Sequence, residues 1–127
     1  MTQEEQLLMV DLCGRLPYGV ICEDEYGNAL ELNSIDKPNT VTFKCSDKTF
    51  WTTDLDKCKP YLFPMSSMTE EQKNEYLETG NYVKLYDINN VWIPSLHTFE
   101  WLDANHFDYR GLIPKDLAND ATNLGIY

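Results

Sequence analysis

Apolar side chains recur at helical spacing in the first stretch of the chain. The positions that form this stripe are Leu8, Met9, Leu12, Cys13 and Leu16. A spacing of three and four residues places them on one face of a helix. Thr2 and Glu5 have the spacing of a capping box, which satisfies backbone N–H groups at a helix start. The pattern predicts a helix over residues 3–13 that lies on a sheet and stops at Gly14.

Alternation of apolar and polar residues replaces the helical spacing after residue 19. Residues 29–32 and 40–45 show this alternation, residues 20–22 lead into the first of these strands, and residues 48–53 are expected to pair back on the second. In residues 40–45, Val41 and Phe43 alternate with threonines, which is typical of a strand with one buried face. Because short turn-forming segments separate the runs, the pattern predicts an antiparallel meander.

Prolines and a capping box divide the next part of the chain. Pro60 and Pro64 bracket an apolar segment, so we expect regular structure to pause between residues 54 and 68. The sequence TEEQ from Thr69 has capping-box spacing and predicts a short helix to about residue 78.

The last third of the chain reads as two strands and a further helix. We expect the strands at residues 82–86 and 91–93 around a turn, and the helix at residues 96–107. The predicted inward face of that helix is formed by Leu96, Phe99 and Leu102. A short helical turn is expected at residues 115–119, and residues 120–127 are expected to be loose.

These elements predict the fold class. The chain is expected to form one compact α+β domain over residues 1–127, in which an antiparallel meander of about four to six strands is packed by the N-terminal and C-terminal helices. A length of 127 residues allows a hydrophobic core without disulfide or metal staples.

Charge narrows the range of partners. The chain has 21 acidic and 10 basic residues, which gives a formal net charge of −11. Binding to a phosphate backbone requires a positive stripe, so direct nucleic-acid binding is not expected. The acids either keep the protein soluble or form a face that docks on a basic partner, and their number leaves both readings open.

Cysteine usage indicates the compartment. The four cysteines are Cys13, Cys22, Cys45 and Cys58. No two have Cys-x-x-Cys spacing, and combinations with His97 and His106 match no zinc pattern, so no metal site and no cofactor are predicted. The chain begins with a helix pattern rather than a signal region, and its apolar runs are too short for a membrane span. We therefore expect a cytoplasmic protein of a bacterial host with reduced thiols and no membrane association.

Three segments resemble a known family. They read KPYLFPMSSMTEE at residues 59–71, WLDANHFDYRGLI at residues 101–113 and DLCGRLPYG at residues 11–19. Together they are similar to a family of small uncharacterised proteins from gut Bacteroidales and their phages and mobile elements. The resemblance implies a phage or mobile-element accessory role, and it implies no activity, ligand or catalytic residue.

The segment 101–111 is the strongest candidate for a ligand site. If the preceding helix ends near Asn105 and the chain becomes extended, His106, Asp108 and Arg110 project to one side at a spacing of two. An imidazole, a carboxylate and a guanidinium together are suited to a phosphate or carboxylate ligand. Tyr109 and Trp101 complete this candidate site.

A structural role for the same residues is the alternative. Asp108 and Arg110 would then pair to hold the helix end, while His106 donates to a buried carbonyl. Arg15 and Arg110 are the only arginines of the chain, and each is equally suited to holding a carboxylate or a helix-end carbonyl.

A second candidate surface combines aromatic and acidic residues. Tyr61, Leu62 and Phe63 form a proline-bracketed apolar loop that is either pinned on the core or exposed for docking. The acidic run Glu23, Asp24 and Glu25 is the predicted electrostatic part of such a surface. The aromatics that form a pocket for a planar ligand or else belong to the core are Trp51, Tyr61, Phe63, Trp92 and Trp101.

The function predicted from these features is binding rather than catalysis. The sequence has no Gly-rich phosphate loop, no Gly-x-Ser-x-Gly and no His-Glu-x-x-His motif. We expect a non-catalytic phage or mobile-element accessory protein that binds a host protein through an acidic and aromatic surface. The alternatives are a binder or hydrolase of nucleotide-like anions that uses residues 106–110, and a structural subunit of a larger particle. The sequence leaves the oligomeric state open.

Overall fold

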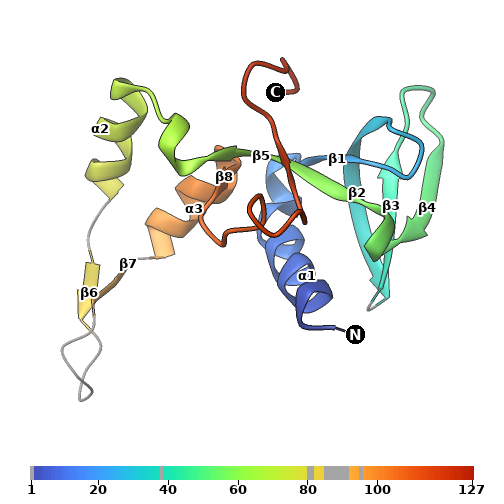
Figure 1. Ribbon diagram of the computed structural model, residues 1–127, viewed down its shortest axis with the longest axis horizontal. Coiled ribbons are helices and arrows are strands. Elements are labelled where there is room, and N and C mark those ends of the chain that lie inside the picture. The colour runs from blue at the N-terminus through green and yellow to red at the C-terminus, as the bar shows by residue number, and fades with distance from the viewer. Residues whose placement is uncertain (1, 38, 80–81, 85–91, 95) are drawn as a thin grey trace.

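The computed structural model describes residues 2–37, 39–79, 82–84, 92–94 and 96–127 (Figure 1). Its α-helices are α1 (Gln3–Arg15), α2 (Glu70–Thr79) and α3 (Leu96–Ala104). Short 3₁₀ turns follow α1, β4 and β5 at Leu16–Tyr18, Leu55–Lys57 and Met65–Ser67. The Thr2 hydroxyl accepts from the Glu5 N–H at 3.0 Å, so the predicted cap at the start of α1 is present.

The main sheet contains seven strands. They are β1 (Ile21–Glu23), β2 (Ala29–Lys37), β3 (Thr40–Lys44), β4 (Phe50–Asp54), β5 (Lys59–Pro64), β8 (Phe107–Asp108) and β9 (Asn119–Asp120). Their order is β4-β3-β2-β1-β5-β8, and β9 pairs with β5. A separate antiparallel pair joins β6 (Tyr82–Lys84) to β7 (Trp92–Pro94). The predicted turn between these two strands, at residues 87–90, lies outside the described residues.

The α+β class with a sheet packed by helices is confirmed. Strands β1 to β4 form the predicted antiparallel meander, with Cys22 opposite Leu30, Leu32 opposite Phe43, and Phe43 opposite Trp51. Cross-strand partners share one face of a sheet, so this register places Leu30, Leu32, Phe43 and Trp51 on a common face. The meander forms one end of the molecule, and α2 with the β6–β7 pair forms the other (Figure 1).

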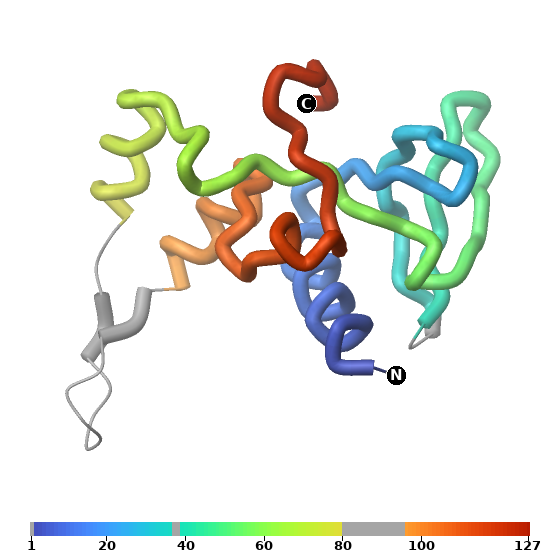
Figure 2. The backbone as a smooth tube through the Cα atoms, viewed as in Figure 1, coloured from blue at the N-terminus to red at the C-terminus, as the bar shows by residue number. Residues whose placement is uncertain are grey.

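The expectation that regular structure pauses between residues 54 and 68 is wrong. Residues 59–64 form β5, which pairs with β1 on its first half and runs parallel to β9 and β8 on its second half. Figure 2 shows β5 crossing the molecule from the meander towards α2. The two prolines misled the prediction, because proline is tolerated at strand starts and ends, where the ladder needs no donor.

The stop predicted at Gly14 is also wrong. Helix α1 continues through Gly14 to Arg15 and passes into a 3₁₀ turn that contains Pro17. A Cβ at Gly14 would lie 2.9 Å from the Asp103 carboxylate, so this glycine permits the close approach of α1 and α3. The turn ends instead at Gly19, whose φ of 71° lies in the left-handed region.

The main core lies between α1 and the meander. Its fully buried members include Leu12, Val20, Cys22, Val41, Phe43, Leu55, Leu62 and Leu112. A smaller cluster around Met68, Leu102 and Phe107 joins α3 to the end of β5. The sheet therefore carries helices at its centre and at its β5 end, while β4 remains at the far edge.

Two details of the C-terminal third differ from the prediction. Leu96 is 73% exposed and does not belong to the inward face of α3, which ends at Ala104 rather than near residue 107. Residues 115–118 form turns and bends rather than a helical turn, and Asn119 begins β9. In the segment expected to be loose, Ala121 is buried and donates its N–H to the Leu62 carbonyl, and the Tyr127 hydroxyl bonds the Tyr61 carbonyl at 2.8 Å.

Within the described ranges, none of the helices combines the length and the apolar character needed to cross a membrane.

Candidate functional site

Residues 106–110 follow α3 in the chain and contact α1, α3 and β5. The chain leaves α3 at Ala104 and is extended at Phe107–Asp108, which agrees with the predicted change of conformation near Asn105. His106, between the two elements, has a φ of 61°. This left-handed residue turns the chain sharply from the helix into β8.

His106 is buried against the C-terminal tyrosine. Its ring stacks on Tyr127 with centroids 3.8 Å apart and planes at 11°. Burial, together with the nearby positive charge of Arg15, lowers the pKa of His106 from 6.5 to about 4. The imidazole is therefore neutral near pH 7, and its Nδ1 has no hydrogen-bond partner among the described residues.

The Asp108 carboxylate binds the backbone of the turn that follows it and does not pair with Arg110. Its two carboxylate oxygens accept from the backbone N–H groups of Leu112 and Ile113, each at 2.9 Å. The pairing of Asp108 with Arg110 that the structural alternative predicts is therefore wrong, because both oxygens already satisfy local backbone donors.

Arg110 and Arg15 share one buried carboxylate. Asp11 accepts from Arg15 Nε at 2.8 Å with one oxygen and from Arg110 Nη1 at 2.7 Å with the other. Arg15 Nη2 also donates to the Phe107 carbonyl at 2.6 Å. Asp11 and Arg15 are completely buried. In this network each arginine binds a carboxylate, and Arg15 also binds a carbonyl, as the structural alternative predicts. The shared carboxylate belongs to α1.

Tyr109 completes the network. Its ring lies beneath both guanidinium groups, 4.4 Å from Arg110 and 5.5 Å from Arg15, and its hydroxyl donates to Asp103 at 2.9 Å. Burial and the hydrogen bond to the Asp103 carboxylate raise the pKa of Tyr109 well above its usual range. These contacts fix residues 106–110 to α1 and α3.

Trp101 belongs to the smaller core cluster. Its ring stacks on Phe107 with centroids 5.6 Å apart and contacts Tyr76 at 5.9 Å. The predicted ligand residues therefore lie near one another. Asp108, Tyr109 and Arg110 each have a polar partner within the protein, whereas His106 Nδ1 has none among the described residues. Arg110 Nη1 already contacts Asp11 and Asp103, so an anion that binds this atom competes with two carboxylates.

The predicted docking loop is part of the sheet. Leu62 is fully buried and Tyr61 nearly so, while Phe63 packs on Phe107 and Tyr127. Tyr61 and Leu62 are therefore not available to a partner in this structure, and they correct that part of the expected surface. These residues are buried because they belong to strand β5, which the sequence pattern did not predict since prolines bracket the segment.

The acidic run 23–25 divides into three environments. Glu23 is half-buried at the end of β1, and Asp24 is buried and accepts from the N–H groups of Tyr26 and Asn28. Glu25 is exposed and accepts from the Thr53 hydroxyl at 3.3 Å. Of the three side chains only that of Glu25 is exposed, and it lies beside β4.

An aromatic pair lies next to Glu25. Tyr26, in the β1–β2 turn, is 71% exposed, and its ring contacts that of Trp51 in β4 with centroids 6.0 Å apart. The pair lies over a hollow of about 250 Å³ whose lining includes Leu30 and Cys45. Large apolar groups left in solvent beside a hollow are typical of binding surfaces.

The opposite face of β4 carries a second exposed aromatic. Phe50 is 61% exposed and lines a wider hollow of about 650 Å³ together with Glu31, Lys44 and Lys48. We call Tyr26, Phe50 and Trp51, together with Glu25 and Asp54, the β4 surface. It differs from the predicted docking surface in its aromatics and shares Glu25 with it.

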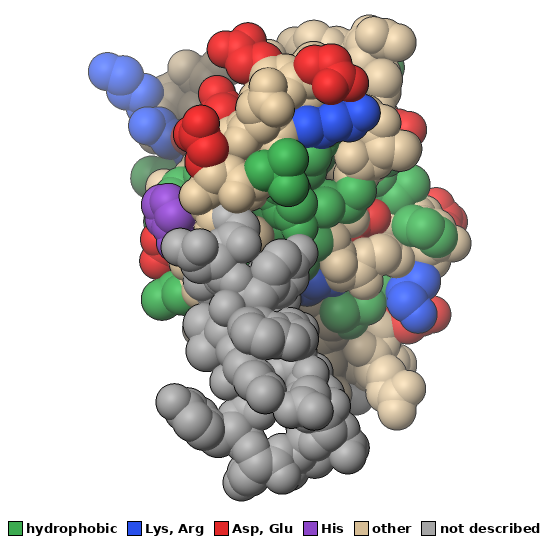
Figure 3. Space-filling model, turned by 90° about the vertical axis from the view of Figure 1, so that its left-hand side faces the viewer, with side chains coloured by type: hydrophobic (Ala, Val, Ile, Leu, Met, Phe, Trp, Pro, Cys, Tyr) green, Lys and Arg blue, Asp and Glu red, His purple; other side chains and the backbone are tan. Residues whose placement is uncertain are grey.

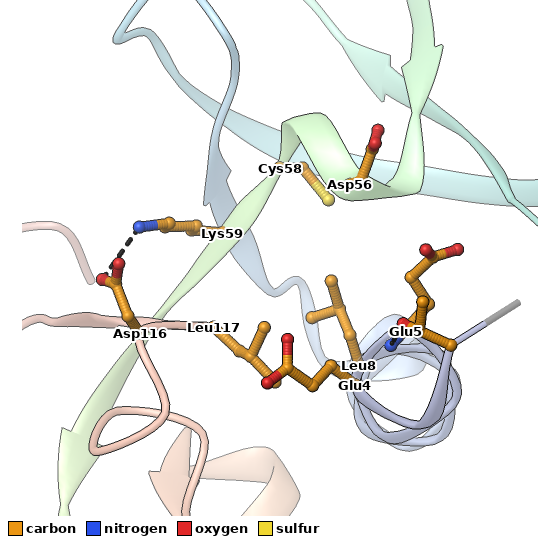
Figure 4. A pocket seen from close by; sticks show the side chains of 9 residues that line it. Glu4, Glu5, Leu8, Asp56, Cys58, Lys59, Asp116 and Leu117 are labelled. Carbon is orange, nitrogen blue, oxygen red and sulfur yellow. Dashed lines mark hydrogen bonds and ion pairs between the residues drawn. The ribbon is translucent and has the colours of Figure 1, made fainter.

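A cavity beside α1 and the end of the molecule that carries α2 are two further surface features. A cavity of about 290 Å³ near the start of α1 has Leu8, Cys58 and Leu117 turned inwards, and Lys59 pairs with Asp116 at its mouth (Figure 4). The end of the molecule that carries α2 shows hydrophobic side chains among acidic and basic ones, beside residues that are not described (Figure 3).

No cluster of three or more potential metal-ligating side chains occurs in the part of the chain that the structure describes. The predicted aromatic pocket is likewise not assembled: Trp51 contacts Tyr26, whereas Phe63 and Trp101 both pack on Phe107. The side chain of Trp92 lies outside the described residues.

Sequence reasoning missed Asp11, Tyr26 and Phe50. Asp11 could have been predicted, since it lies four residues before Arg15 on the same face of α1. A carboxylate and a guanidinium on a buried helix face are expected to form an ion pair. Tyr26 lies in a turn and Phe50 on the edge strand β4, and no local pattern in the sequence shows that these two side chains are exposed.

Comparisons with protein-family models, with curated proteins and with solved structures found no significant match for this chain.

Proposed function

We propose that this chain is a non-catalytic binding protein that docks on a partner protein through the β4 surface. The observation that carries the proposal is the exposed Tyr26–Trp51 pair over its hollow, with Glu25 beside it. Tyrosine and tryptophan give a large contact area at a small cost in conformational entropy, and they are enriched at the centres of interfaces.

The charge of the protein supports a basic partner. A net charge of −11 accelerates encounter with a positively charged surface and opposes association of two copies of the chain. The polar side chains of Asp108, Tyr109 and Arg110, by contrast, are engaged by the protein itself, which supports a structural role for that part of the segment.

The biological setting that we propose is a phage or mobile-element accessory protein that acts on a host protein in a Bacteroidales cell. This setting follows from the resemblance of segments 59–71 and 101–113 to that family. The absence of a recognisable catalytic motif is in keeping with a role in binding.

The proposal is tested by comparing partner capture between variants. The tagged chain, expressed in a gut Bacteroidales host, should retain a stoichiometric protein that native mass spectrometry detects. Trp51→Ser and Glu25→Lys should each reduce its recovery at least about tenfold, because they remove an aromatic anchor and invert a rim charge. Leu77→Ser is the matched control, since Leu77 is 72% exposed on α2, far along the chain from β4.

The two possible results separate clearly. A partner that Leu77→Ser retains and Trp51→Ser loses supports the β4 surface, provided that both variants melt as the unaltered protein does. Equal recovery with Trp51→Ser and Glu25→Lys contradicts it.

Binding of a nucleotide-like anion is the second candidate. The observation in its favour is that Arg15 Nη1 and His106 Nδ1 are buried polar atoms without a hydrogen-bond partner in the described structure. A thermal-shift panel of nucleotides tests this function directly. A shift that Arg110→Ala abolishes without unfolding the protein would support it, and no shift with any nucleotide would remove it.

A further inference from the structure

We infer that β4 receives an extended segment of the partner protein as an additional strand of the sheet. This inference rests on the proposed function and states how that surface would recognise its partner. Strand addition at a sheet edge gains affinity from main-chain hydrogen bonds and specificity from alternating side chains.

The register shows which backbone groups of β4 are directed towards the edge. Cys45 N–H donates to the Thr49 carbonyl at 2.9 Å, and Leu55 N–H donates to the Asn39 carbonyl at 2.7 Å. Hydrogen-bonded pairs alternate with non-bonded pairs in an antiparallel ladder. Trp51 and Thr53 therefore face β3 through their backbone groups, whereas Phe50, Thr52 and Asp54 direct their N–H and C=O groups away from β3.

The edge of β4 is accessible and has few of the usual protective features. Among the described strands, β4 is terminal in the sheet and pairs with β3. Natural edges are commonly blunted by proline, lysine or a bulge, and β4 consists of two aromatic residues, two threonines and one aspartate in a regular register. Such a strand is suited to pairing with a further strand.

The two faces of β4 specify the chemistry of the added strand. Trp51 lies on the face where Thr53 contacts Glu25, and Phe50 lies on the opposite face with Lys44. Side chains of an added strand alternate between these faces. Those beside Trp51 should therefore be lysine or arginine, which can stack on the ring and pair with Glu25, and those beside Phe50 should be apolar.

A basic segment of another protein fits this edge better than a second copy of the chain. Two copies would bring together net charges of −11, and pairing of β4 with β4 would place the Asp54 of each copy in the same short ladder. A lysine-bearing or arginine-bearing strand removes this repulsion and uses the same backbone groups.

The experiment is a selection from a displayed random-peptide library on the unaltered protein, followed by affinity measurements with the enriched peptides as synthetic probes. Thr52→Pro removes the outward N–H at the centre of β4 at a position where the β3 ladder needs no donor. Thr52→Val is its matched control, because both variants lose the hydroxyl that contacts Thr42 and only valine keeps the N–H.

We expect enriched peptides that alternate basic with apolar residues. They should bind Thr52→Val within about twofold of the unaltered protein. They should bind Thr52→Pro at least about tenfold more weakly, because proline removes one backbone hydrogen bond and its ring faces the added strand. Peptides methylated at alternate backbone nitrogens should show a similar loss, and this test does not depend on the folding of Thr52→Pro.

The other results overturn the inference in two distinguishable ways. Peptides that bind Thr52→Pro and tolerate N-methylation but are lost with Trp51→Ser would contradict strand addition and leave the proposed surface in place. If no peptide is enriched, or if every enriched peptide binds Thr52→Pro and Trp51→Ser as well as the unaltered protein, strand addition and the β4 surface are both contradicted.

Discussion

Asp11 and Arg110, which are 99 positions apart in the sequence, form an ion pair of 2.7 Å between Oδ1 and Nη1. This pair joins α1 to the segment that follows β8. The other oxygen of Asp11 holds Arg15, so one carboxylate compensates two guanidinium groups. The segment with the densest chemistry in the sequence is thereby tied to the first helix, which leaves the β4 surface as the better candidate for binding.

Asp11→Ala should destabilise the protein strongly. The change leaves the fully buried Arg15 without its carboxylate, and breaking a buried pair in this way costs about 3–5 kcal/mol. Urea unfolding followed by circular dichroism measures the loss. Glu70→Ala, which removes an exposed pair with Lys73, is the control and should change stability little. A loss for Asp11→Ala no greater than that of the control would contradict a structural role for the network.

Gly14→Ala should also destabilise the protein, although alanine is the better helix former by about 1 kcal/mol. The added methyl group would lie 2.9 Å from Asp103 Oδ2 and 3.4 Å from Arg110 Nη2. Crowding of a packed site typically costs about 1–3 kcal/mol, which exceeds the gain in helix propensity. Differential scanning calorimetry checks the sign: an increase in Tm would show that the Asp103 carboxylate moves aside at little cost and would contradict the predicted crowding.

Acidification should destabilise the protein through His106. The folded protein holds the pKa of His106 at about 4, whereas the unfolded chain takes up a proton near pH 6.5. The contribution of His106 is therefore fully present above pH 6.5 and is lost as the pH falls from 6.5 to 4. One pKa unit corresponds to about 1.4 kcal/mol, so a loss on the order of 2 kcal/mol is expected.

Urea titrations at pH 7 and pH 4.5 measure this loss in free energy of unfolding. His106→Asn is the informative variant, because asparagine tolerates the left-handed backbone at this position and does not titrate. Its stability should change less between the two pH values than that of the unaltered protein. His97→Gln, at an exposed position of α3, should retain the full pH dependence.

Thiol reactivity should divide the cysteines into two classes. Cys13 is exposed and Cys45 is half-buried, whereas Cys22 and Cys58 are buried. The adjacent Cys58 thiol and burial raise the pKa of Cys22, which keeps it protonated. Ellman's reagent should therefore label two thiols readily in the native state and four after denaturation. Rapid labelling of all four in the native protein would contradict the packing around β1 and β5.

The sequence predicted the elements whose residues repeat regularly. Helix α1 and the β1–β4 meander follow from the apolar positions that recur along them, such as Leu8 with Leu12 and Val41 with Phe43. Strand β5 was not predicted, because it has no repeating pattern of apolar residues. Pro60 and Pro64 indicated a break in regular structure, although Tyr61 and Leu62 between them are buried. Proline excludes a strand only where a donor is required, and the sequence does not show where that is.

The candidate site was predictable only in part. The residues from Trp101 to Arg110 do lie near one another, as sequence proximity ensures, but their partners come from distant positions such as Asp11 and Tyr127. Long-range pairing of this kind follows from how helices and strands pack, which no local pattern encodes. The exposure of Tyr26 and Phe50 has the same origin, since it depends on where the sheet ends.

Amide hydrogen exchange of the protein with and without its captured partner tests the central claim most directly. Binding through the β4 surface predicts slower exchange of the amides at residues 50–54 and of Tyr26, with residues 70–79 of α2 unchanged. The outward-facing amide of Thr52 should show the largest change within β4. Protection confined to α2, or to the cavity beside the start of α1, would contradict the proposed binding surface.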